Sequence, residues 1–283
     1  MKICILIQVH KNKEFINRIV NRIKDEKIDI WVNADSKFDV SEDDFKGCYF
    51  VENRIDVKWG EISQTIATMN SIREILSSGI KYDRIIYISG QDYPIKPINE
   101  LVKFFSKKAN LDKEFISYSE VGKDKWDIRY RYAYNHYKNR YITKLCSFIM
   151  HKPFIKNYRP YGGSTWFNIT PKAAEYILKK YEEDGFEEYF KYSLCIDELI
   201  FQSIIMNEDS PFKEKVINNS LRYIDWSDHK NGLNKGNPNT LTINDYEKII
   251  ESDAFFARKF DPEIDKEIIE KLDLYIDEYY EQI

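Results

Sequence analysis

Two acidic residues, Asp197 and Glu198, stand side by side at the start of an apolar helical pattern. On a helix over 196–206, Glu198 would share one face with Phe201 and Gln202, three and four positions later. A glutamate that loses water on such a face becomes a stronger base. Asp197 points elsewhere, and attraction of both acids to the helix N-terminus would explain the pair without any chemistry. The pair is therefore a candidate for a base that takes the proton of an attacking hydroxyl.

Two adjacent cations, Arg258 and Lys259, form the second candidate group. A lysine ammonium is a compact charge with three donors and can neutralise a diphosphate. An exposed basic pair is also a common solvent-facing feature, so the two interpretations stay open. Beside the acid pair, the cations suggest group transfer from an activated donor that carries phosphate.

Two further acids follow predicted strands. Asp35 follows a strand at 28–34, where a carboxylate accepts hydrogen bonds from a ribose or a base, or else closes an Asx turn. Asp92 follows a strand at 83–89. Enzymes that bridge a pyrophosphate with Mg²⁺ or Mn²⁺ usually carry Asp-x-Asp in such a turn, because these ions require carboxylate oxygens. A single acid disfavours a metal and requires another neutraliser for the diphosphate.

Two other stretches could contact a partner. The segment 161–167 contains two glycines, two hydroxyls and Trp166, whose ring could stack on a sugar; a bulged strand start explains it equally well. The stretch 123–159 is rich in basic and aromatic residues, with only Asp124 and Asp127 as acids. It predicts either an ordinary solvated face or a docking surface for a lipid-linked phosphate or an acidic membrane, and less readily for nucleic acid.

The positioning elements alternate along the chain. This alternation predicts an α/β fold with a mostly parallel sheet flanked by helices. No linker or repeat divides the 283 residues, so a single domain is expected. The expected strands are 2–9, 28–34, 83–89, 114–118, 163–169 and 221–226, and the expected helices are 13–25, 62–78, 97–108, 171–182, 187–207, 243–252 and 263–281.

Several classes of protein are disfavoured. The first apolar run is too short for a signal or a membrane span. The four cysteines lack C-x-x-C spacing, so reduced thiols are expected and a zinc site is not. The phosphate-loop and G-x-S-x-G patterns are missing as well. No cofactor or metal is therefore expected.

The residues resemble one known family. The matching pieces, in chain order, are Val9-His10-Lys11, Asn33-Ala34-Asp35-Ser36-Lys37, Trp59-Gly60, Ser89 to Lys96, Gly162 to Phe167, Asp197-Glu198 and Phe256 to Asp261. Together they resemble the core-2/I-branching β-1,6-N-acetylglucosaminyltransferase and peptide O-xylosyltransferase family, glycosyltransferase family 14. The likeness covers about residues 3 to 261.

The resemblance implies a GT-A-type, Rossmann-like fold and an inverting, metal-independent transfer. It would place a nucleotide-binding half at 1–110 and an acceptor-binding, catalytic half at 111–283. By position, Glu198 resembles the catalytic base. The residues implied to bind the donor are Val9, Asp35, Arg258 and Lys259, and those implied to bind the acceptor are Glu120, Trp166 and Trp226.

The chain departs from the family at one position. Many relatives have an arginine on the diphosphate where this chain has Asn239, so that either Arg258 or Lys235 compensates or the donor is held more weakly. The role of Asp197 is unassigned. The membrane anchor and cysteine framework of the eukaryotic members are also missing from this sequence. We therefore expect a bacterial, cytoplasmic enzyme, with peripheral contact to the inner face of the plasma membrane through 123–159.

The resulting expectation is transfer of a sugar, GlcNAc or xylose first, from a UDP-sugar to a hydroxyl of a glycan or lipid-linked glycan in surface polysaccharide synthesis. Nucleic acid is not an expected partner. The alternative is a non-catalytic adaptor that docks on a membrane or an anionic glycan, whose binding would weaken steeply with salt. A nucleotidyltransferase is disfavoured, since it needs a metal-binding carboxylate pair.

Overall fold

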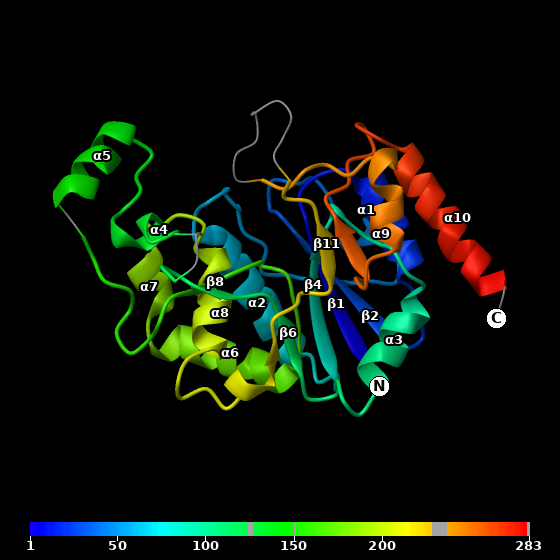
Figure 1. The fold of residues 1–283 in the computed structure, drawn as a ribbon, viewed down its shortest axis with the longest axis horizontal. Coiled ribbons are helices and arrows are strands. Elements are labelled where there is room, and N and C mark those ends of the chain that lie inside the picture. Colours follow the sequence, from blue (N-terminus) through cyan, green and yellow to red (C-terminus); the bar gives the residue numbers. More distant parts are fainter. Residues whose placement is uncertain (124–126, 150, 228–236, 282–283) are drawn as a thin grey trace.

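A seven-stranded, largely parallel sheet forms the middle of the molecule, in a computed structural model that describes residues 1–123, 127–149, 151–227 and 237–281 (Figure 1). The strand order is β10-β6-β9-β4-β1-β2-β3, and β9 runs antiparallel to both of its neighbours. All residues of β1 and β4 are buried, as expected for parallel strands covered on both faces. The strands are β1 (Ile3–Val9), β2 (Ile28–Ala34), β3 (Tyr49–Phe50), β4 (Arg84–Ser89), β6 (Glu114–Ile116), β9 (Phe167–Ile169) and β10 (Val216–Ile217).

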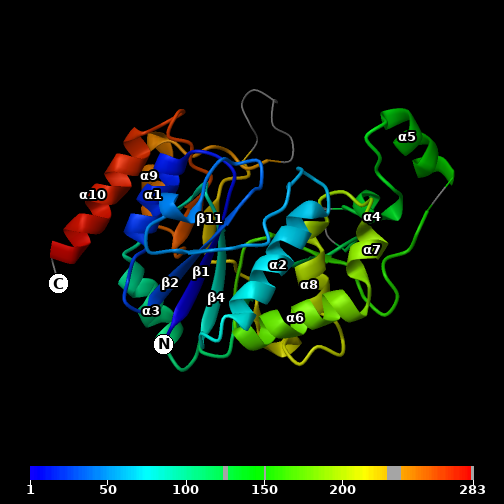
Figure 2. The same cartoon turned by 180° about the vertical axis from the view of Figure 1, so that it is seen from behind.

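Helices cover the two faces of this sheet (Figures 1 and 2). Successive side chains of a strand point to opposite faces, so Ile5 and Ile7 enter one hydrophobic core while Cys4 and Leu6 enter the other. The first core is closed by α1 (Lys13–Arg22), α3 (Ile98–Ser106), α9 (Tyr246–Ile250) and α10 (Glu267–Glu281). The second is closed by α2 (Ser63–Ser77), α6 (Pro171–Glu183), α7 (Phe186–Phe190) and α8 (Ile200–Ile205).

Smaller elements complete the fold, and one of them is a small sheet that includes the strand following β4. A three-stranded sheet, β11-β12-β5, places Arg258 opposite Asp92 across an antiparallel pair. A two-stranded ribbon pairs β7 with β8, and two further helices, α4 and α5, lie at one end of the molecule (Figure 1). The bounds are β5 (Asp92–Pro94), β7 (Ser119–Glu120), β8 (Tyr161–Gly162), β11 (Arg222–Ile224), β12 (Phe256–Arg258), α4 (Tyr130–Ala133) and α5 (Arg140–Ile149).

The predicted α/β class, with a mostly parallel sheet flanked by helices, is confirmed. Strands from both predicted halves share the central sheet, since β9 pairs with β4. None of the helices within the described ranges is long and apolar enough to cross a membrane.

The single helix expected over 187–207 is wrong. The chain there forms α7, a 3-10 turn at Ile196–Glu198, and then α8. Two backbone amides of the interruption are drawn to other segments: Leu194 N–H donates to the Arg131 carbonyl and Cys195 N–H to the Gly60 carbonyl, each at 2.8 Å. Cys195 itself has φ 47°, in the left-handed region, so a helix cannot pass through it.

Candidate functional site

The carboxyl ends of β1, β2 and β4 meet at one edge of the central sheet. The amide of Asp35 donates to the Val9 carbonyl at 2.9 Å, and the amide of Gly90 donates to the Gln8 carbonyl at 2.8 Å. Two predicted donor residues, Val9 and Asp35, are thus adjacent, and the turn that leads to Asp92 lies beside them. Ligands of open α/β sheets bind at this edge.

The Asp35 side chain stabilises the turn in which it lies. The side chain is 6% exposed, and its Oδ1 accepts the Lys37 amide at 2.8 Å, which is the Asx turn considered from the sequence. Lys37 Nζ lies 3.3 Å from Oδ2, and Arg54 donates to the Asp35 carbonyl at 2.9 Å. Its contact to a nucleotide stays a prediction.

Asp92 is a fully buried carboxylate surrounded by donors. It accepts the amide of Ser89 at 2.9 Å and the Ser89 hydroxyl. The Nε atoms of Arg222 and Arg258 each lie 3.5 Å from its carboxylate oxygens. Burial lowers the pKa of Arg222 to about 10 and also lowers that of Arg258, while the charge of Asp92 opposes both shifts. The position expected to carry a metal ligand in metal-dependent enzymes is here neutralised by two guanidinium groups.

Arg258 and Lys259 enter this arrangement from the end of β12. The Arg258 guanidinium lies 4.7 Å from the centre of the Trp166 ring, a cation–π distance. Lys259 is half-buried, and its pKa is lowered by burial and by the charges of Arg258 and Lys11, against the opposing effect of Asp261. Among the described residues no carboxylate lies within ion-pair distance of its ammonium group. An anion bound here would relieve the repulsion between these cations.

The departure at Asn239 lies next to this group. The Asn239 side-chain amide donates to Asp225 Oδ2 at 2.7 Å, and the Leu241 amide donates to the Lys259 carbonyl at 2.9 Å. Asn239 therefore fixes the loop that passes Lys259 but supplies no charge to it. Arg258 is the described candidate for compensation, while Lys235 lies outside the described residues.

The acid pair lies in the 3-10 turn rather than on a continuous helix, so the expected shared face with Phe201 and Gln202 does not form. Glu198 receives a hydrogen bond from Arg131, and its backbone carbonyl accepts the Gly163 amide at 2.9 Å. Its side chain keeps 29% of its surface exposed, against 13% for that of Arg131. A half-buried carboxylate oriented by a less exposed arginine remains accessible to a bound molecule.

The pKa of the Asp197 carboxyl is raised to about 6. Burial is the largest cause, the charge of Glu198 adds to it, and a 2.8 Å hydrogen bond from the Thr165 hydroxyl opposes it. Thr165 and Trp166, neighbours in sequence, therefore join the two groups, because one holds Asp197 and the other contacts Arg258.

The three predicted acceptor residues differ in how exposed they are and in what they contact. Trp166 is 8% exposed and contacts both Tyr87 and Arg258, so its ring is not an open platform. Glu120 pairs with Lys123 at 2.5 Å on β7, whose partner strand β8 leads directly to Gly163. Trp226 follows β11 and is 58% exposed. The acceptor roles of all three stay predictions.

Sequence reasoning missed the positioning residues of the site. In the sequence, Arg131 is one of many basic residues in 123–159, Thr165 is one of the two hydroxyls in 161–167, and no local pattern distinguishes Arg222. The available signal was weak: the nearest described acid in sequence, Asp127, pairs with Arg129, and the carboxylate that Arg131 contacts lies 67 residues later.

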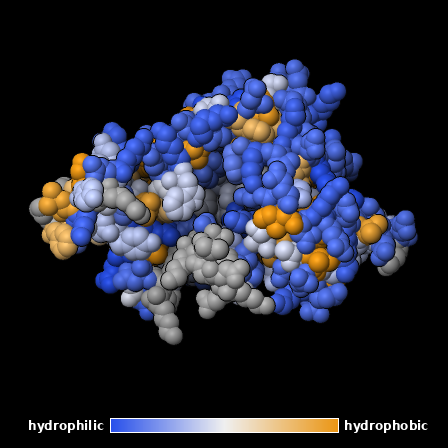
Figure 3. Space-filling view, turned by 90° about the horizontal axis from the view of Figure 1, so that it is seen from above, coloured by the Kyte–Doolittle hydropathy of each residue, from blue (hydrophilic) through white to orange (hydrophobic). Residues whose placement is uncertain are grey.

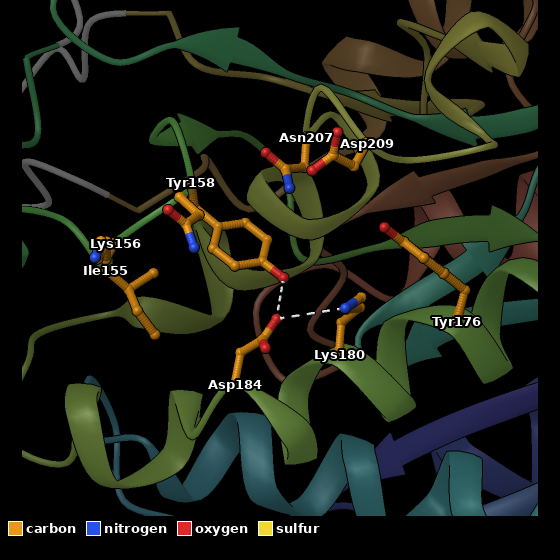
Figure 4. Close-up of a pocket in the computed structure, with 9 residues that line it drawn as sticks. Ile155, Lys156, Tyr158, Tyr176, Lys180, Asp184, Asn207 and Asp209 are labelled. Carbon is orange, nitrogen blue, oxygen red and sulfur yellow. Dashed lines mark hydrogen bonds and ion pairs between the residues drawn. The ribbon is translucent and has the colours of Figure 1, made fainter.

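A cavity of about 300 Å³ lies elsewhere, near the end of α6 (Figure 4). Its lining includes Tyr158, whose hydroxyl donates to Asp184, and Lys180, which pairs with Asp184 at 3.8 Å. None of the predicted site residues lines it. Within the described part of the chain, no three His, Cys, Asp or Glu side chains are grouped so as to hold a metal ion.

Comparison with known proteins identifies the family that this chain matches. Residues 6–250 match the family described as Core-2/I-Branching enzyme. Xylosyltransferase 2 of Rattus norvegicus is 27% identical over 238 residues, covering 77% of this chain and 26% of that protein. Xylosyltransferase 1 of Canis lupus familiaris is 25% identical over 241 residues, covering 79% and 24%. The chain thus spans about a quarter of the length of these curated relatives.

Solved structures resemble the fold distantly. The galactosyltransferase LgtC, in complex with donor and acceptor sugar analogs, aligns over 92% of this chain and 87% of its own, with a TM-score of 0.43 and 12% identity.

The raised pKa of Asp197 leads to a testable prediction about its titration. Between pH 4 and 6 the folded chain holds a proton on Asp197 that the unfolded chain has released, so this group's contribution to stability falls as pH rises through that window, by about 2 kcal/mol. We expect a midpoint near pH 6 for the Asp197 carboxyl carbon by NMR. It should move down in Glu198→Gln, because one raising charge is removed.

Glu188→Gln, at an exposed position on α7, is the control and should leave the midpoint unchanged. A midpoint near pH 4 in the wild type, or no shift in Glu198→Gln, would contradict the assignment.

Proposed function

The chain belongs to the Core-2/I-branching enzyme family of glycosyltransferases, with its GT-A-type fold, and from that premise we propose that it transfers a sugar from a UDP-sugar to a hydroxyl of a glycan acceptor, with inversion and without a metal. The observation that carries the proposal is the link that Thr165 and Trp166 make between two groups: the acid pair, in which Thr165 contacts Asp197 and Arg131 orients Glu198, and the Arg258-Lys259 cations. An inverting transfer requires these two parts, a base for the acceptor and a counter-charge for the leaving diphosphate.

In the proposed step, Glu198 takes the acceptor proton while the acceptor oxygen forms its bond to the anomeric carbon. The bond from that carbon to the diphosphate breaks, and UDP leaves with the electron pair. Arg131 orients Glu198 by its hydrogen bond, and Asp197, held by Thr165, keeps negative charge beside it. Lys259, half-buried among other cations, stabilises the growing charge on the leaving group.

Metal independence is proposed from the state of Asp92. A divalent ion would need this carboxylate free, whereas two arginines and Ser89 occupy it. Arg258 contacts Asp92 and also precedes Lys259 directly in the chain. From there it can help Lys259 to neutralise a diphosphate. The nucleotide would lie over the edge formed by Val9 and Asp35, in the half at 1–110.

The donor sugar is proposed as GlcNAc or xylose, the latter favoured by the xylosyltransferase names of the relatives. The acceptor is proposed as a glycan or lipid-linked glycan of a bacterial surface polysaccharide, modified on the cytoplasmic side. Glu120, Trp166 and Trp226 would contact it.

Replacing the proposed base should separate catalysis from binding. Glu198→Gln keeps the shape and the Arg131 contact but cannot accept the proton, so we expect turnover to fall by at least about 10²-fold. The dissociation constant for UDP, measured by calorimetry, should stay within about twofold, and Glu188→Gln should retain full turnover. Wild-type turnover in Glu198→Gln would remove Glu198 from the mechanism.

Replacing the proposed counter-charge should act mainly on the transition state. Lys259→Ala is expected to lower kcat by about 10- to 100-fold and to weaken UDP binding less, because charge on the diphosphate grows as the bond breaks. Lys266→Ala, at an exposed position before α10, is the matched control. A pure KM effect in Lys259→Ala would make this lysine a ground-state contact only.

Chelation tests the metal-free proposal directly. Activity of the purified protein in excess EDTA should equal that in buffer, since the diphosphate is neutralised by side chains. Loss in EDTA with recovery on Mn²⁺ would contradict the proposal and make Asp92 a candidate ligand after all.

A further inference from the structure

The helix α5 exposes its apolar side to solvent. Tyr141 is 86% exposed, Ile142 48%, Leu145 59% and Phe148 76%. Because these residues follow helical spacing, they form one continuous apolar stripe. The helix lies at the end of the molecule, away from the central sheet (Figure 1), and hydrophobic residues gather at the same end in the space-filling view (Figure 3).

The burial of α5 is the reverse of that of a helix packed on its own domain. Such a helix buries its apolar stripe and exposes its polar side. Among the α5 residues whose burial the structure describes, the less exposed ones are Thr143, Cys146 and Ser147. The stripe is therefore a surface for something other than the described part of this chain.

The sequence that flanks the stripe is rich in positive charge. Residues 128–174 contain nine Lys or Arg and no Asp or Glu, in a protein whose net charge is −4. Lys138, Lys144 and Lys156 are exposed, and no carboxylate pairs with them within the described residues. A second copy of the chain would bring two such regions face to face in a twofold contact, with repulsion between them.

We propose that α5 docks on an anionic membrane surface, with its stripe in the headgroup region and the neighbouring lysines against lipid phosphates. An exposed apolar stripe flanked by cations is the physical pattern of a helix that lies in the membrane interface. Each basic side chain near an anionic surface adds to the attraction. Aromatic residues such as Tyr141 and Phe148 suit the boundary between headgroups and acyl chains.

The base of α5 is tied to the candidate site. In the preceding segment, Arg131 on α4 pairs with Glu198, and the His136 amide donates to the Tyr192 carbonyl at 2.7 Å. On the other side of α5, the Lys152 amide donates to the Ala133 carbonyl at 2.7 Å. If the proposed function holds, docking would hold the acid pair at a fixed position relative to the membrane, where a lipid-borne acceptor is presented.

Vesicle sedimentation tests the docking. We expect the wild-type chain to bind vesicles of phosphatidylglycerol and phosphatidylcholine, less well at high salt, and to bind pure phosphatidylcholine at least about tenfold more weakly. The triple variant Tyr141→Ser, Leu145→Ser, Phe148→Ser should lose binding to the mixed vesicles by about tenfold or more. The control triple Ile217→Ser, Ile264→Ser, Leu274→Ser removes exposed apolar residues elsewhere and should bind like the wild type.

A second set of measurements tests the role of charge and the oligomeric state. Lys144→Glu should weaken binding, whereas Lys266→Glu should not. Equal vesicle binding by the wild-type and α5 triple variants would overturn the proposal. So would a dimer that dissociates only in the α5 variant and binds no vesicles, since the stripe would then be a contact between copies.

UDP-sugar hydrolysis in solution separates this proposal from the enzymatic one. The α5 variant should hydrolyse UDP-sugar at the wild-type rate, because none of its changes touches the candidate site. Vesicle binding without any hydrolysis would contradict the proposed function and leave the docking standing; hydrolysis without vesicle binding would do the reverse.

Discussion

The structure of the site depends on one buried charge, the Asp92 carboxylate. A fully buried carboxylate is stable only when it is paired, and Asp92 has ion pairs to Arg222 and Arg258 at 3.5 Å and hydrogen bonds from Ser89. These partners belong to β11, β12 and the end of β4, so one side chain fastens the small sheet to the large one. The positions of Lys259 and of the loop with Asn239 follow from that attachment.

The same arrangement distributes charge across the site. Arg258 faces Asp92 and Trp166; burial lowers its pKa, and the charges of Asp92 and Glu198 oppose that shift. Lys259 is then left among cations without a carboxylate partner in the described chain, while Glu198 is held by Arg131. Positive charge collects on one side of Trp166 and negative charge beside Thr165. That separation is what the proposed transfer from a phosphate-bearing donor to a hydroxyl requires.

The sequence predicted the regular part of the fold because hydrophobic periodicity is local. The strands at 3–9, 28–34 and 84–89 and the helices α1, α2 and α6 follow directly from it. The break between α7 and α8 depends on amides bonding to Gly60 and Arg131, far away in sequence, and no local pattern records such bonds. The strand β12 escaped prediction for the same reason, since its register is set by Asp92 on β5.

The acid-free stretch at 128–174 has an electrical consequence for the whole molecule. The remainder of the chain carries all 47 acidic side chains and only 34 of the 43 basic ones, so positive charge is concentrated in the stretch that contains α5. In the field of a negatively charged surface, such a molecule turns before it makes contact. The field would therefore both attract and rotate the protein, so that α5 faces the surface when the two meet.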